Sequence, residues 1–599
     1  MNARDRKELV EKLRSLEGLT EDEKSALIGM LNTQKKYGLV WEDKPEDVEE
    51  KLRTELPVLR EVPERAIISG VADAPNHIVI EGDNLEALTA LTFTHAGKID
   101  VIYIDPPYNT GNNDFKYNDN FVDKEDGYRH SKWLSFMSKR LKIAKKLLSD
   151  IGVIFISIDD NEQAQLKLLC DELFGEVNFK STSIIVNNRG GRDYGGIALQ
   201  HDYILIFGKS SFSELKLVQE NEKEFKFKDD KGGFNLMELR NRNVRFNDKN
   251  RPNLFYPFYV NPEKEDSNGL LEISLEPVEG FIKVLPSISN GIQTVWRWGK
   301  EEKSRGALNI EIFGKKNRNG GYMIVQKYRK TTKMQRSIWD EKDFVNERGT
   351  EALKDLFNGE AIFGYPKSTY TIKRVLEIGS NPDSLILDFF AGSGTTMHAV
   401  MQLNAEDGGH RRCILVNNNE NRICEEVTYE RNKRVINGYT TPRGEVVEGL
   451  KENSLRYYKT DFIPRGRSMK NMRALMAAST DLLCVRNDVY REASFNGKKL
   501  SKKVVRYFEE GDKRMMVIYD ERAIFEIVDM IREAPDGGKI IVYVFSPSSD
   551  PFRDCFEEVA DRVEPVPLPS AIYDAYRRVL PKEAEQPIIE SSDTEEAEP

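Results

Sequence analysis

The residues best suited to chemistry follow a short apolar run near position 100. Residues 101–104 lead directly into Asp105-Pro106-Pro107-Tyr108-Asn109-Thr110-Gly111. Apolar residues that end in a carboxylate and two prolines predict a buried strand with polar groups at its C-terminal tip. Ligands of open α/β sheets bind at that edge. The sequence therefore predicts a reactive site at this turn.

This turn suits the attack of an exocyclic amine on a methyl donor. The lone pair of such a nitrogen is delocalised into its ring, so a catalyst must accept hydrogen bonds from the amino group. The Asp105 carboxylate and the Pro106 carbonyl are two acceptors, and the prolines fix φ so that the acceptors are held in advance. Tyr108 offers a flat face to a base that has left its duplex. The alternative is a strand that stops at a Pro-Pro turn, with Asp105 as a local cap.

A second stretch combines an apolar strand with a glycine turn. It reads Leu385-Ile386-Leu387-Asp388-Phe389-Phe390-Ala391-Gly392-Ser393-Gly394-Thr395-Thr396 and continues into a helical pattern from Met397. The two glycines permit a tight turn and the close approach of a ligand to the backbone. Met397 stands where a dinucleotide fingerprint has its third glycine, and no phosphate-cradling Gly-x-x-x-x-Gly-Lys-Ser/Thr occurs. The turn therefore does not match the usual nucleotide-phosphate motifs.

Asp-Pro-Pro-Tyr followed by Phe-x-Gly-x-Gly resembles the DNA amino-methyltransferases that use S-adenosylmethionine. The order, with the catalytic motif first, is that of the β class. The longer run from Asp105 to Gly111, the preceding Glu81-Gly82-Asp83-Asn84 and the length of 599 residues are similar to the modification subunit of Type III restriction-modification systems. The resemblance covers residues 76–440 well and the C-terminal region more loosely.

The resemblance implies a role for each motif. Asp105, Pro106, Pro107 and Tyr108 would act on the target base, and acidic residues at 159–162 would line its pocket. The cofactor residues implied are Asp83 near the adenine, Lys367 at the methionine carboxylate, Glu420 at the ribose, and Ser368, Asp388, Phe390, Ala391, Gly392, Gly394 and Thr395. Capping of a helix is the alternative for Asp83 and for 159–162. Phe389 departs from the family pattern, which often has proline there, so the backbone of the glycine turn is left open.

A basic insertion separates the two motifs. Residues 211–355 are too many for a loop of a compact sheet and predict a domain of their own. Clusters of Lys and Arg there, with Trp296-Arg297-Trp298 interleaved, fit contacts to phosphates and base edges, and the resemblance labels the region a target-recognition domain. A solvated surface is the alternative for any single residue. The DNA contacts predicted are Arg240, Arg242, Arg245, Arg297, Lys315, Lys316, Arg318, Arg329 and Lys330, with Arg189 and Arg192 from a loop at 187–192.

The predicted fold is a circularly permuted, Rossmann-like α/β methyltransferase core with this inserted domain. Expected strands include 77–80, 101–104, 153–158, 183–186, 203–207, 385–388 and 413–416, and 112–126 is expected to be a loop over the base pocket. The expected parts are an N-terminal helical segment (1–56), a catalytic half (57–210), the target-recognition domain (211–355), a cofactor half (356–440), a small C-terminal α/β domain (441–582) and a disordered acidic tail (583–599).

Bulk properties favour a globular cytoplasmic protein. Hydrophobic residues make up 39% and charged residues 31% of the chain, no secretory signal or membrane-spanning run is apparent, and five scattered cysteines are expected to be reduced. The net charge of −10 would oppose DNA binding only if it were spread evenly. No His/Cys cluster suggests a metal.

The expected activity is adenine-N6 methylation of double-stranded DNA, with a homodimer and a helicase-nuclease restriction subunit as implied partners. Cytosine N4 is the nearest alternative target, because its amino group poses the same electronic problem. A related defence system or an orphan enzyme would have the same motifs. A subunit that binds DNA without catalysis is a further alternative, which the intact motif set disfavours.

Overall fold

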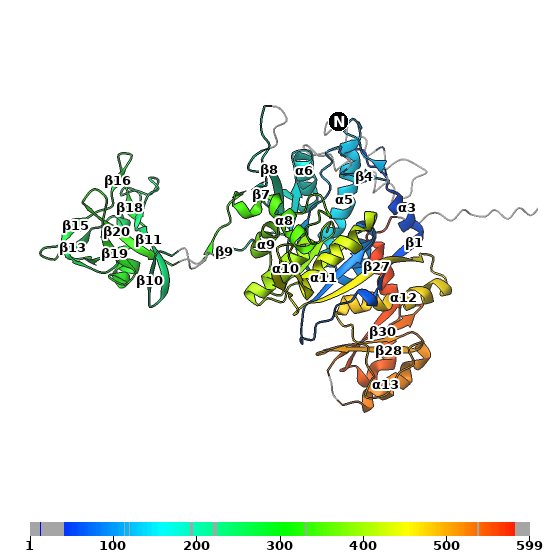
Figure 1. Ribbon diagram of the computed structural model, residues 1–599. Coiled ribbons are helices and arrows are strands. Elements are labelled where there is room, and N and C mark those ends of the chain that lie inside the picture. Colours follow the sequence, from blue (N-terminus) through cyan, green and yellow to red (C-terminus); the bar gives the residue numbers. More distant parts are fainter. Residues whose placement is uncertain are drawn as a thin grey trace, which may run out of the picture. The chain divides into compact units, whose positions relative to one another are not determined.

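The computed structural model describes residues 12, 41–112, 114–118, 120–191, 196–219, 225–329, 332–535 and 538–581. The chain divides into two compact units, Met1–Lys216 with Arg336–Pro599, and Leu217–Gln335 (Figure 1). Most of the predicted N-terminal segment, the acidic tail, Arg192 and Lys330 lie outside the described residues. No helix within the described ranges is long and apolar enough to cross a bilayer.

The first unit is built on a ten-stranded mixed sheet. Its order is β1 (Glu55–Glu61), β27 (Ser454–Pro464), β2 (Asn76–Glu81), β24 (Arg412–Asn417), β23 (Leu385–Asp388), β3 (Ile99–Ile104), β6 (Leu148–Ile158), β8 (His201–Gly208), β7 (Phe179–Val186) and β22 (Ile338–Trp339). The strands from β27 to β6 are mutually parallel, and β1 and β8 run antiparallel to their neighbours. Because the parallel strands are covered on both faces, they are continuous apolar runs.

Helices cover both faces of this sheet. On one face lie α4 (Asn84–His95), α5 (Arg129–Leu147), α6 (Gln163–Phe174), α12 (Met469–Asn487) and α14 (Ser570–Arg577), whose buried residues share one core with Ile102, Ile104, Ile154 and Ile156. On the other lie α9 (Thr369–Gly379) and α10 (Thr395–Asp407); Gly379 of α9 approaches the Phe155 ring so closely that a Cβ there would lie 2.7 Å from it. α8 (Asn346–Leu356) and α11 (Glu430–Asn437) pack beside them.

The catalytic strand and the glycine-turn strand are direct neighbours. β23 pairs in parallel with β3, with Ile386 opposite Val101 and Leu387 opposite Ile102. Their carboxyl ends therefore meet at one edge, although about 280 residues separate them in the sequence. The condition on which the sequence prediction depends, that the two motifs share one rim, is met.

The second unit has its own sheet. Seven strands run in the order β10 (Phe227–Asp229), β11 (Gly232–Glu238), β20 (Tyr322–Tyr328), β19 (Ile312–Lys316), β14 (Leu271–Ser274), β13 (Phe258–Glu265) and β15 (Ile282–Val284). A core that includes Phe258, Ile273, Trp296 and Ile324 fills one side. The unit begins and ends with a two-stranded ladder, in which β9 (Val218–Gln219) pairs antiparallel with β21 (Thr332–Lys333).

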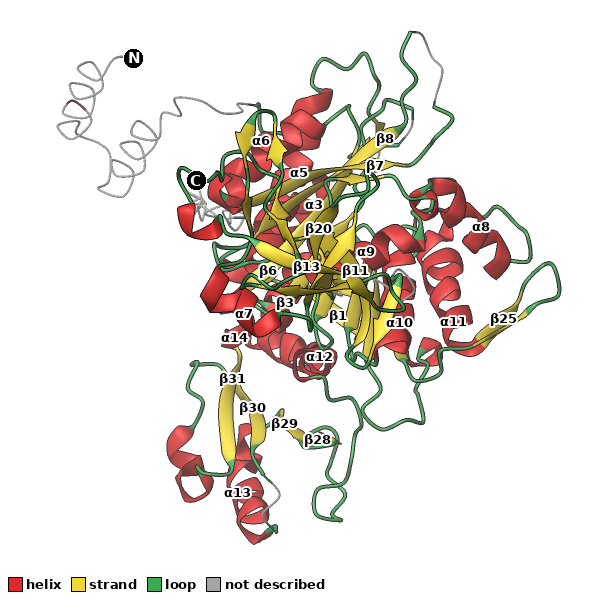
Figure 2. Ribbon diagram, turned by 90° about the vertical axis from the view of Figure 1, so that its left-hand side faces the viewer, coloured by secondary structure: helices red, strands yellow, loops and turns green. Residues whose placement is uncertain are grey.

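A four-stranded sheet follows α12 in the C-terminal region. Its order is β28 (Val505–Glu510), β29 (Lys513–Ile518), β30 (Ile540–Ser546) and β31 (Val563–Pro569), with α13 (Ile524–Glu533) packed on one face (Figure 2). The opposite face, including Phe508 and Val517, joins the core of the first unit through α12. This region therefore belongs to the same compact unit as the large sheet.

Several expected bounds differ from the structure. The inserted unit is Leu217–Gln335 rather than 211–355, because β22 pairs with β7 of the large sheet. β27 completes the large sheet, although the sequence analysis assigned 441–582 to a separate C-terminal domain. β1 is a strand that the sequence analysis missed; it contains Pro57, which weakens the sequence signal for a strand. Within the expected loop 112–126, β4 (Lys116–Tyr117) and β5 (Asn120–Phe121) form a short ladder.

Candidate active site

A cavity of about 670 Å³ lies where β3 and β23 end. Five further segments contribute to its lining: the turn after β6, the start of β8, the start of α8, the segment 363–367 that leads into α9, and the start of α10. Its lining includes Tyr103, Asp105, Pro106, Tyr108, Asp159, Asp202, Asn346, Phe363, Lys367, Asp388, Phe390, Ala391, Gly392, Ser393 and Thr395. The cavity thus contains most of the residues predicted for catalysis and for the cofactor.

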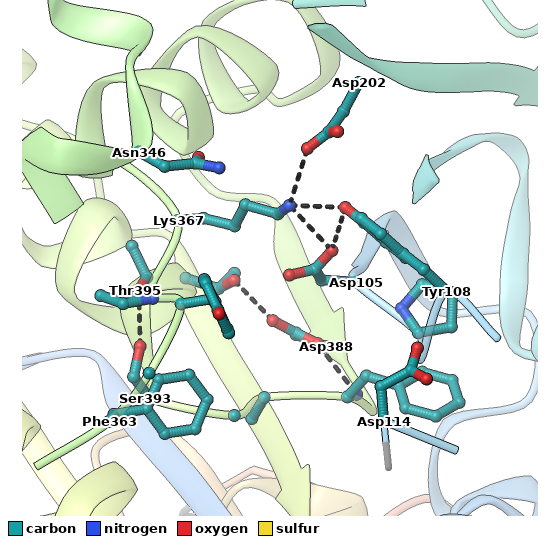
Figure 3. A pocket seen from close by; sticks show the side chains of 18 of the residues that line it. Asp105, Tyr108, Asp114, Asp202, Asn346, Phe363, Lys367, Asp388, Ser393 and Thr395 are labelled. Carbon is teal, nitrogen blue, oxygen red and sulfur yellow. Dashed lines mark hydrogen bonds and ion pairs between the residues drawn. The ribbon is translucent and has the colours of Figure 1, made fainter. Parts of the chain in front are cut away.

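A buried charge network surrounds the predicted catalytic carboxylate (Figure 3). The Tyr108 hydroxyl donates to Asp105 Oδ1 at 2.8 Å, and Lys367 Nζ lies 3.2 Å from the same oxygen. Lys367 Nζ also donates to the Tyr108 hydroxyl and lies 3.6 Å from Asp202 Oδ2. The side chains of Lys367 and Asp202 are 14% and 15% exposed, so one ammonium is shared by two carboxylates away from bulk water.

Burial and charge act in opposite directions on this network. Burial raises the pKa of Asp105, while the Lys367 ammonium and the Tyr108 hydroxyl oppose the increase. Burial alone would lower the pKa of Lys367, but the carboxylates of Asp105 and Asp202 raise it, so the amine stays charged. Lys367 therefore favours the ionised form of Asp105, which is the form that accepts hydrogen bonds from an amino group.

Buried side chains hold the backbone turn that follows Tyr108. Asn109 has a φ of +58° and is 1% exposed, and its side-chain amide donates to Glu162 Oε1 at 2.5 Å. Glu162 is fully buried, and His130 Nδ1 lies 2.6 Å from the same oxygen. Burial raises the pKa of Glu162 to about 8, and burial lowers the pKa of His130. Both groups are therefore neutral at pH 7, and Glu162 supports the turn rather than lining the base pocket.

The glycine turn is held by left-handed backbone and by Asp388. Gly392 and Gly394 have φ of +49° and +76°. Asp388 accepts hydrogen bonds from the Phe390 backbone N–H at 3.0 Å and from the Thr396 hydroxyl at 2.6 Å. A Cβ at Gly394 would lie 2.6 Å from Asn432 Nδ2 and 3.0 Å from the Thr428 carbonyl oxygen. Phe389 is buried at 1% exposure and is accommodated in this turn without proline.

A second cavity, of about 650 Å³, adjoins the first. Both are lined by Asp105, Pro106, Asp114, Phe363, Phe390 and Gly392. The second is also lined by the acceptor-rich set Asp83, Asn84, Asn417, Asn418 and Glu420. Carboxylates and amides suit the amino group of an adenine and the hydroxyls of a ribose, and Phe390 offers a flat face. The paired cavities, which both reach the glycine turn, therefore fit a methyl donor that carries an adenosine.

Some predicted cofactor residues have structural contacts instead. Ser368 is 0% exposed and does not line either cavity; its hydroxyl donates to the Asp343 carbonyl oxygen at 2.6 Å and caps α9. Its assignment to the cofactor is therefore corrected. Asp83 caps α4, accepting from Leu85 N at 2.7 Å, and also lines the second cavity, so the cap is confirmed and the contact with the cofactor adenine stays a prediction. Glu420 lines this cavity and pairs with Lys116.

The basic residues of the inserted unit are paired more fully than the sequence suggests. The Arg329 guanidinium donates two hydrogen bonds to the Asp229 carboxylate, at 2.7 and 2.5 Å. Arg240 contacts Glu238 at 2.8 Å. Lys316 pairs with Glu265 at 2.8 Å. No acidic residue lies between Lys315 and Arg336 in the sequence, yet Asp229 on β10 and Glu265 on β13, two other strands of the same sheet, are the acidic partners of Arg329 and Lys316. The local sequence around these basic residues cannot reveal such pairs. Arg329 and Arg240 are therefore poor candidates for phosphate contacts, which corrects their assignment.

The remaining predicted DNA residues are more accessible. Arg245 and Arg318 are exposed and have no acidic partner within the part of the chain that the structure describes. The Arg242 side chain is 72% exposed, although it contacts Glu238 at 3.0 Å. Arg297 is exposed and contacts Met237, and the Lys315 ammonium lies 5.5 Å from the centre of the Phe227 ring. Arg189, in the first unit, is exposed and donates to the Asp340 backbone carbonyl.

Asp202 and Asn346 are site residues that sequence analysis missed. Asp202 lies near the start of β8, which runs antiparallel to β6, so it reaches the edge where the parallel strands end. A strand whose direction is not known in advance gives no such signal. Asn346 begins α8 after the inserted unit, in a stretch that had been assigned to that unit.

Comparisons with known proteins agree with this site. A family model described as "DNA methylase" matches residues 99–436. The Type II methyltransferase M.KpnI of Klebsiella pneumoniae is 37% identical over 377 residues, covering 62% of this chain and 87% of the relative. The Type III restriction-modification enzyme EcoPI Mod subunit of Escherichia phage P1 is 34% identical over 384 residues, covering 57% of this chain and 58% of the relative. The StyLTI Mod subunit of Salmonella typhimurium is 33% identical over 365 residues, with 57% and 52% covered.

The chain thus spans a little over half the length of these two Mod subunits. Among solved structures, PvuII DNA methyltransferase (cytosine-N4-specific) matches with a TM-score of 0.29 at 10% identity, covering 58% of this chain and 86% of that one. The family model spans more than half of this chain and includes both motifs. The resemblance inferred from the motifs is confirmed, and with it the methyl donor S-adenosylmethionine. The chain belongs to the DNA methylase family and is a DNA methyltransferase.

Proposed function

We propose that the chain methylates N6 of a target adenine in double-stranded DNA, as the modification subunit of a Type III restriction-modification system. The observation that carries the proposal is the position of Asp105. Its carboxylate lies in a cavity that also reaches the glycine turn. An acidic residue at the first position of the motif favours adenine, since family members that act on cytosine more often have serine there.

In this proposal the chain's own residues orient the adenine and the methyl donor and exclude water from the site. In the proposal the adenine leaves the duplex, at a cost of a few kcal/mol that stacking and hydrogen bonding offset. The Tyr108 ring stacks on the base, and Asp105 with the Pro106 carbonyl accepts from its amino group. Bound S-adenosylmethionine supplies a methyl group made electrophilic by a sulfonium sulfur. Phe390, the glycine turn and the Asp83–Glu420 side of the second cavity hold the donor.

The net positive charge of the inserted unit supports its proposed role in reading the target sequence. Leu217–Gln335 contains 22 lysines and arginines and 16 acidic residues, a net charge of +6, whereas the whole chain carries −10. In the proposal Arg242, Arg245, Arg297, Lys315 and Arg318 contact DNA from this unit, and Arg189 contacts it from the first. Such a concentration of positive charge is the electrostatic footprint of a nucleic-acid-binding module.

The finer architecture and the partners belong to the same proposal. The catalytic strand precedes the glycine-turn strand in the chain, which supports a circularly permuted Rossmann-like core. The Mod subunits among the relatives support a helicase-nuclease restriction subunit as partner. A homodimer and a cytoplasmic location complete the proposal.

Digestion of modified DNA to nucleosides tests the target base. DNA incubated with the protein and S-adenosylmethionine should yield N6-methyl-2′-deoxyadenosine, detected by mass spectrometry. Asp105→Ala should abolish transfer and leave calorimetric binding of S-adenosylmethionine intact. N4-methylcytosine in the digest would refute the adenine assignment, and undiminished methylation by Asp105→Ala would refute the catalytic one.

A further inference from the structure

Arg431 is a buried cation beneath the glycine turn without an acidic counterion. It lies on α11 and is 0% exposed. Its guanidinium donates to the Thr395 hydroxyl at 2.7 Å and the Ser393 hydroxyl at 3.0 Å, and His398 Nδ1 lies 3.3 Å away. No carboxylate within the described part of the chain forms an ion pair with it, and burial lowers the pKa of His398 well below its ordinary range, so that ring is neutral.

An unpaired buried charge is costly. Burial lowers the pKa of Arg431 to about 9, which leaves the guanidinium charged at neutral pH. Arg411 provides a comparison within the same protein: it is 4% exposed and contacts Asp407 at 2.8 Å. A buried arginine usually has such a partner, because desolvation of a lone ion costs several kcal/mol. Arg431 has the surroundings of a cation whose counterion arrives with a ligand.

The two hydroxyls connect Arg431 to the cavity. Ser393 and Thr395 line the first cavity at 4% and 5% exposure, and their oxygens lie 3.1 Å apart (Figure 3). Each hydroxyl accepts from Arg431, so neither can donate back to it. If one hydroxyl donates to the other, one hydroxyl hydrogen remains for a ligand. The hydroxyl pair therefore presents to the cavity a donor that a positive charge polarises from behind.

We propose that Arg431 is a positioning residue for the carboxylate of the methyl donor, acting through the hydroxyls of Ser393 and Thr395. Lys367, which the family resemblance placed at that carboxylate, is already held by Asp105, Asp202 and Tyr108. The inference rests on the use of S-adenosylmethionine and holds whether the target is adenine or cytosine. It assigns a ligand-dependent role to a buried cation near the turn that lacks a protein counterion among the described residues.

Two ligands that differ at the carboxylate end test this role. S-adenosylhomocysteine has the amino and carboxylate groups, and 5′-methylthioadenosine has the same adenosine and thioether without them. Calorimetry should show that Arg431→Met lowers the preference for S-adenosylhomocysteine over 5′-methylthioadenosine by about 10- to 100-fold, the usual range for a hydrogen bond to a charged group. Because this is a ratio of two dissociation constants, it does not depend on the fraction of protein that is folded.

Arg411→Met is the matched control, since it removes an equally buried guanidinium outside the cavity and should leave the preference unchanged. Ser393→Ala with Thr395→Val should lower it in the same direction while leaving Arg431 in place. Equal weakening of both ligands by Arg431→Met would show that Arg431 only supports the turn and would overturn the proposal, as would an unchanged preference. Neither result depends on which base is methylated.

A separate cavity, of about 370 Å³, lies in the C-terminal region. It is lined by Arg473, Lys502, Lys503, Arg506, Met476, Ala477, Tyr519 and Phe545, without an acidic residue. Tyr519 and Phe545 mark the carboxyl ends of β29 and β30, the edge at which parallel strands usually bind ligands. The Arg473 guanidinium lies 4.5 Å from the centre of the Phe545 ring.

The charge of this cavity is only partly balanced. Glu492 contacts Lys502 at 2.7 Å and Arg506 at 3.0 Å, and Glu521 lies 3.9 Å from Arg473. Lys503 is exposed and has no partner among the described residues. The chain outside Leu217–Gln335 is strongly acidic, so a cationic pocket there is unusual. We infer that it binds backbone phosphates of the substrate DNA outside the recognised sequence, with Arg473 and Lys503 as donors.

The salt dependence of DNA binding tests this second site. Arg473→Gln with Lys503→Gln should weaken binding of a long duplex about 10-fold at physiological salt and reduce the slope of log K against log salt by about 1 to 2. Lys498→Gln with Lys499→Gln removes the same charge from the same region outside the cavity and is the matched control. Equal effects of the two pairs would overturn the inference, and so would no effect. Methylation of a saturating duplex should be unchanged, which separates this test from that of the proposed function.

Discussion

Replacement of Lys367 by methionine tests the origin of the reactivity of Asp105. The substitution keeps most of the side-chain volume and removes the charge that faces Asp105 and Asp202. Lys367 Nζ lies 3.2 Å from Asp105 Oδ1. Two unit charges at this separation attract by about 5 kcal/mol at an effective dielectric constant of about 20. Removal of one partner from a buried pair typically costs about 3–5 kcal/mol, which is consistent with that figure.

The loss should depend on pH. Without the ammonium, burial and the neighbouring Asp202 raise the pKa of Asp105 further. A larger share of the protein then has a protonated Asp105 at neutral pH, and a protonated carboxyl accepts poorly from the amino group. We expect kcat/KM to fall about 100- to 1000-fold at neutral pH and to recover towards the wild-type value as pH rises. The acidic limb of the pH–rate profile should move to higher pH.

Initial rates of methyl transfer, measured across pH with saturating S-adenosylmethionine, would show this shift. Lys373→Met is a suitable control, because Lys373 lies on α9 and pairs with Glu406 outside both cavities. Lys367→Arg keeps the charge and should retain the wild-type acidic limb. A uniform loss at every pH, with a raised KM for S-adenosylmethionine, would show instead that Lys367 serves the methionine carboxylate. That result would refute the electrostatic reasoning.

Three further changes probe the surroundings of the site. Tyr108→Phe should keep methyl transfer within a few-fold of wild type because the ring still stacks. Tyr108→Ala should weaken the binding of DNA by about 1–3 kcal/mol in fluorescence titrations. Equal DNA affinities of the two variants would exclude stacking. Glu162→Gln should have a higher free energy of unfolding than wild type, by a difference that grows as pH rises from about 4.5 to about 8. The reason is that the buried acid of the wild type is protonated in the folded state and ionised in the unfolded state. A difference that stays constant with pH in urea titrations would contradict the raised pKa of Glu162. Gly394→Ala should lower the free energy of unfolding by about 1–3 kcal/mol. The loss should be larger than for Gly408→Ala, because Gly408 also has a left-handed φ, of +70°, but no atom lies within 4 Å of the added carbon. Equal losses would show that packing against Asn432 is unimportant.

Local patterns predicted the elements that form the site. The strands that end at Asp105 and Asp388 are apolar runs bounded by Pro-Pro and by glycines, which are strong signals. Parallel strands place their ligands at one edge, so the shared cavity followed from general rules. The long insertion between the motifs also predicted a separate unit, although its end was placed too late because β22 is only two residues long.

The parts that sequence did not reveal depend on contacts between distant segments. Asp202 approaches Lys367 only because β8 runs antiparallel to β6. Arg329 loses its value as a phosphate contact because Asp229, 100 residues away, lies opposite it. Ser368 is followed by a helix and was read as a ligand, but its hydroxyl completes a cap. Each of these outcomes is set by tertiary pairing rather than by composition or spacing.

The narrow ladder at the base of the inserted unit has a consequence for inheritance. The chain enters that unit at β9 and leaves it at β21, and Gln219 lies opposite Thr332. The unit is therefore attached at two adjoining points, and its seven-stranded sheet is separate from the ten-stranded one. Recombination at these two points would exchange the whole module for another whose ends also lie side by side, leaving Asp105 and the glycine turn intact. If the inserted unit reads the target sequence, as proposed, a gene of this design acquires a new recognition sequence in a single event.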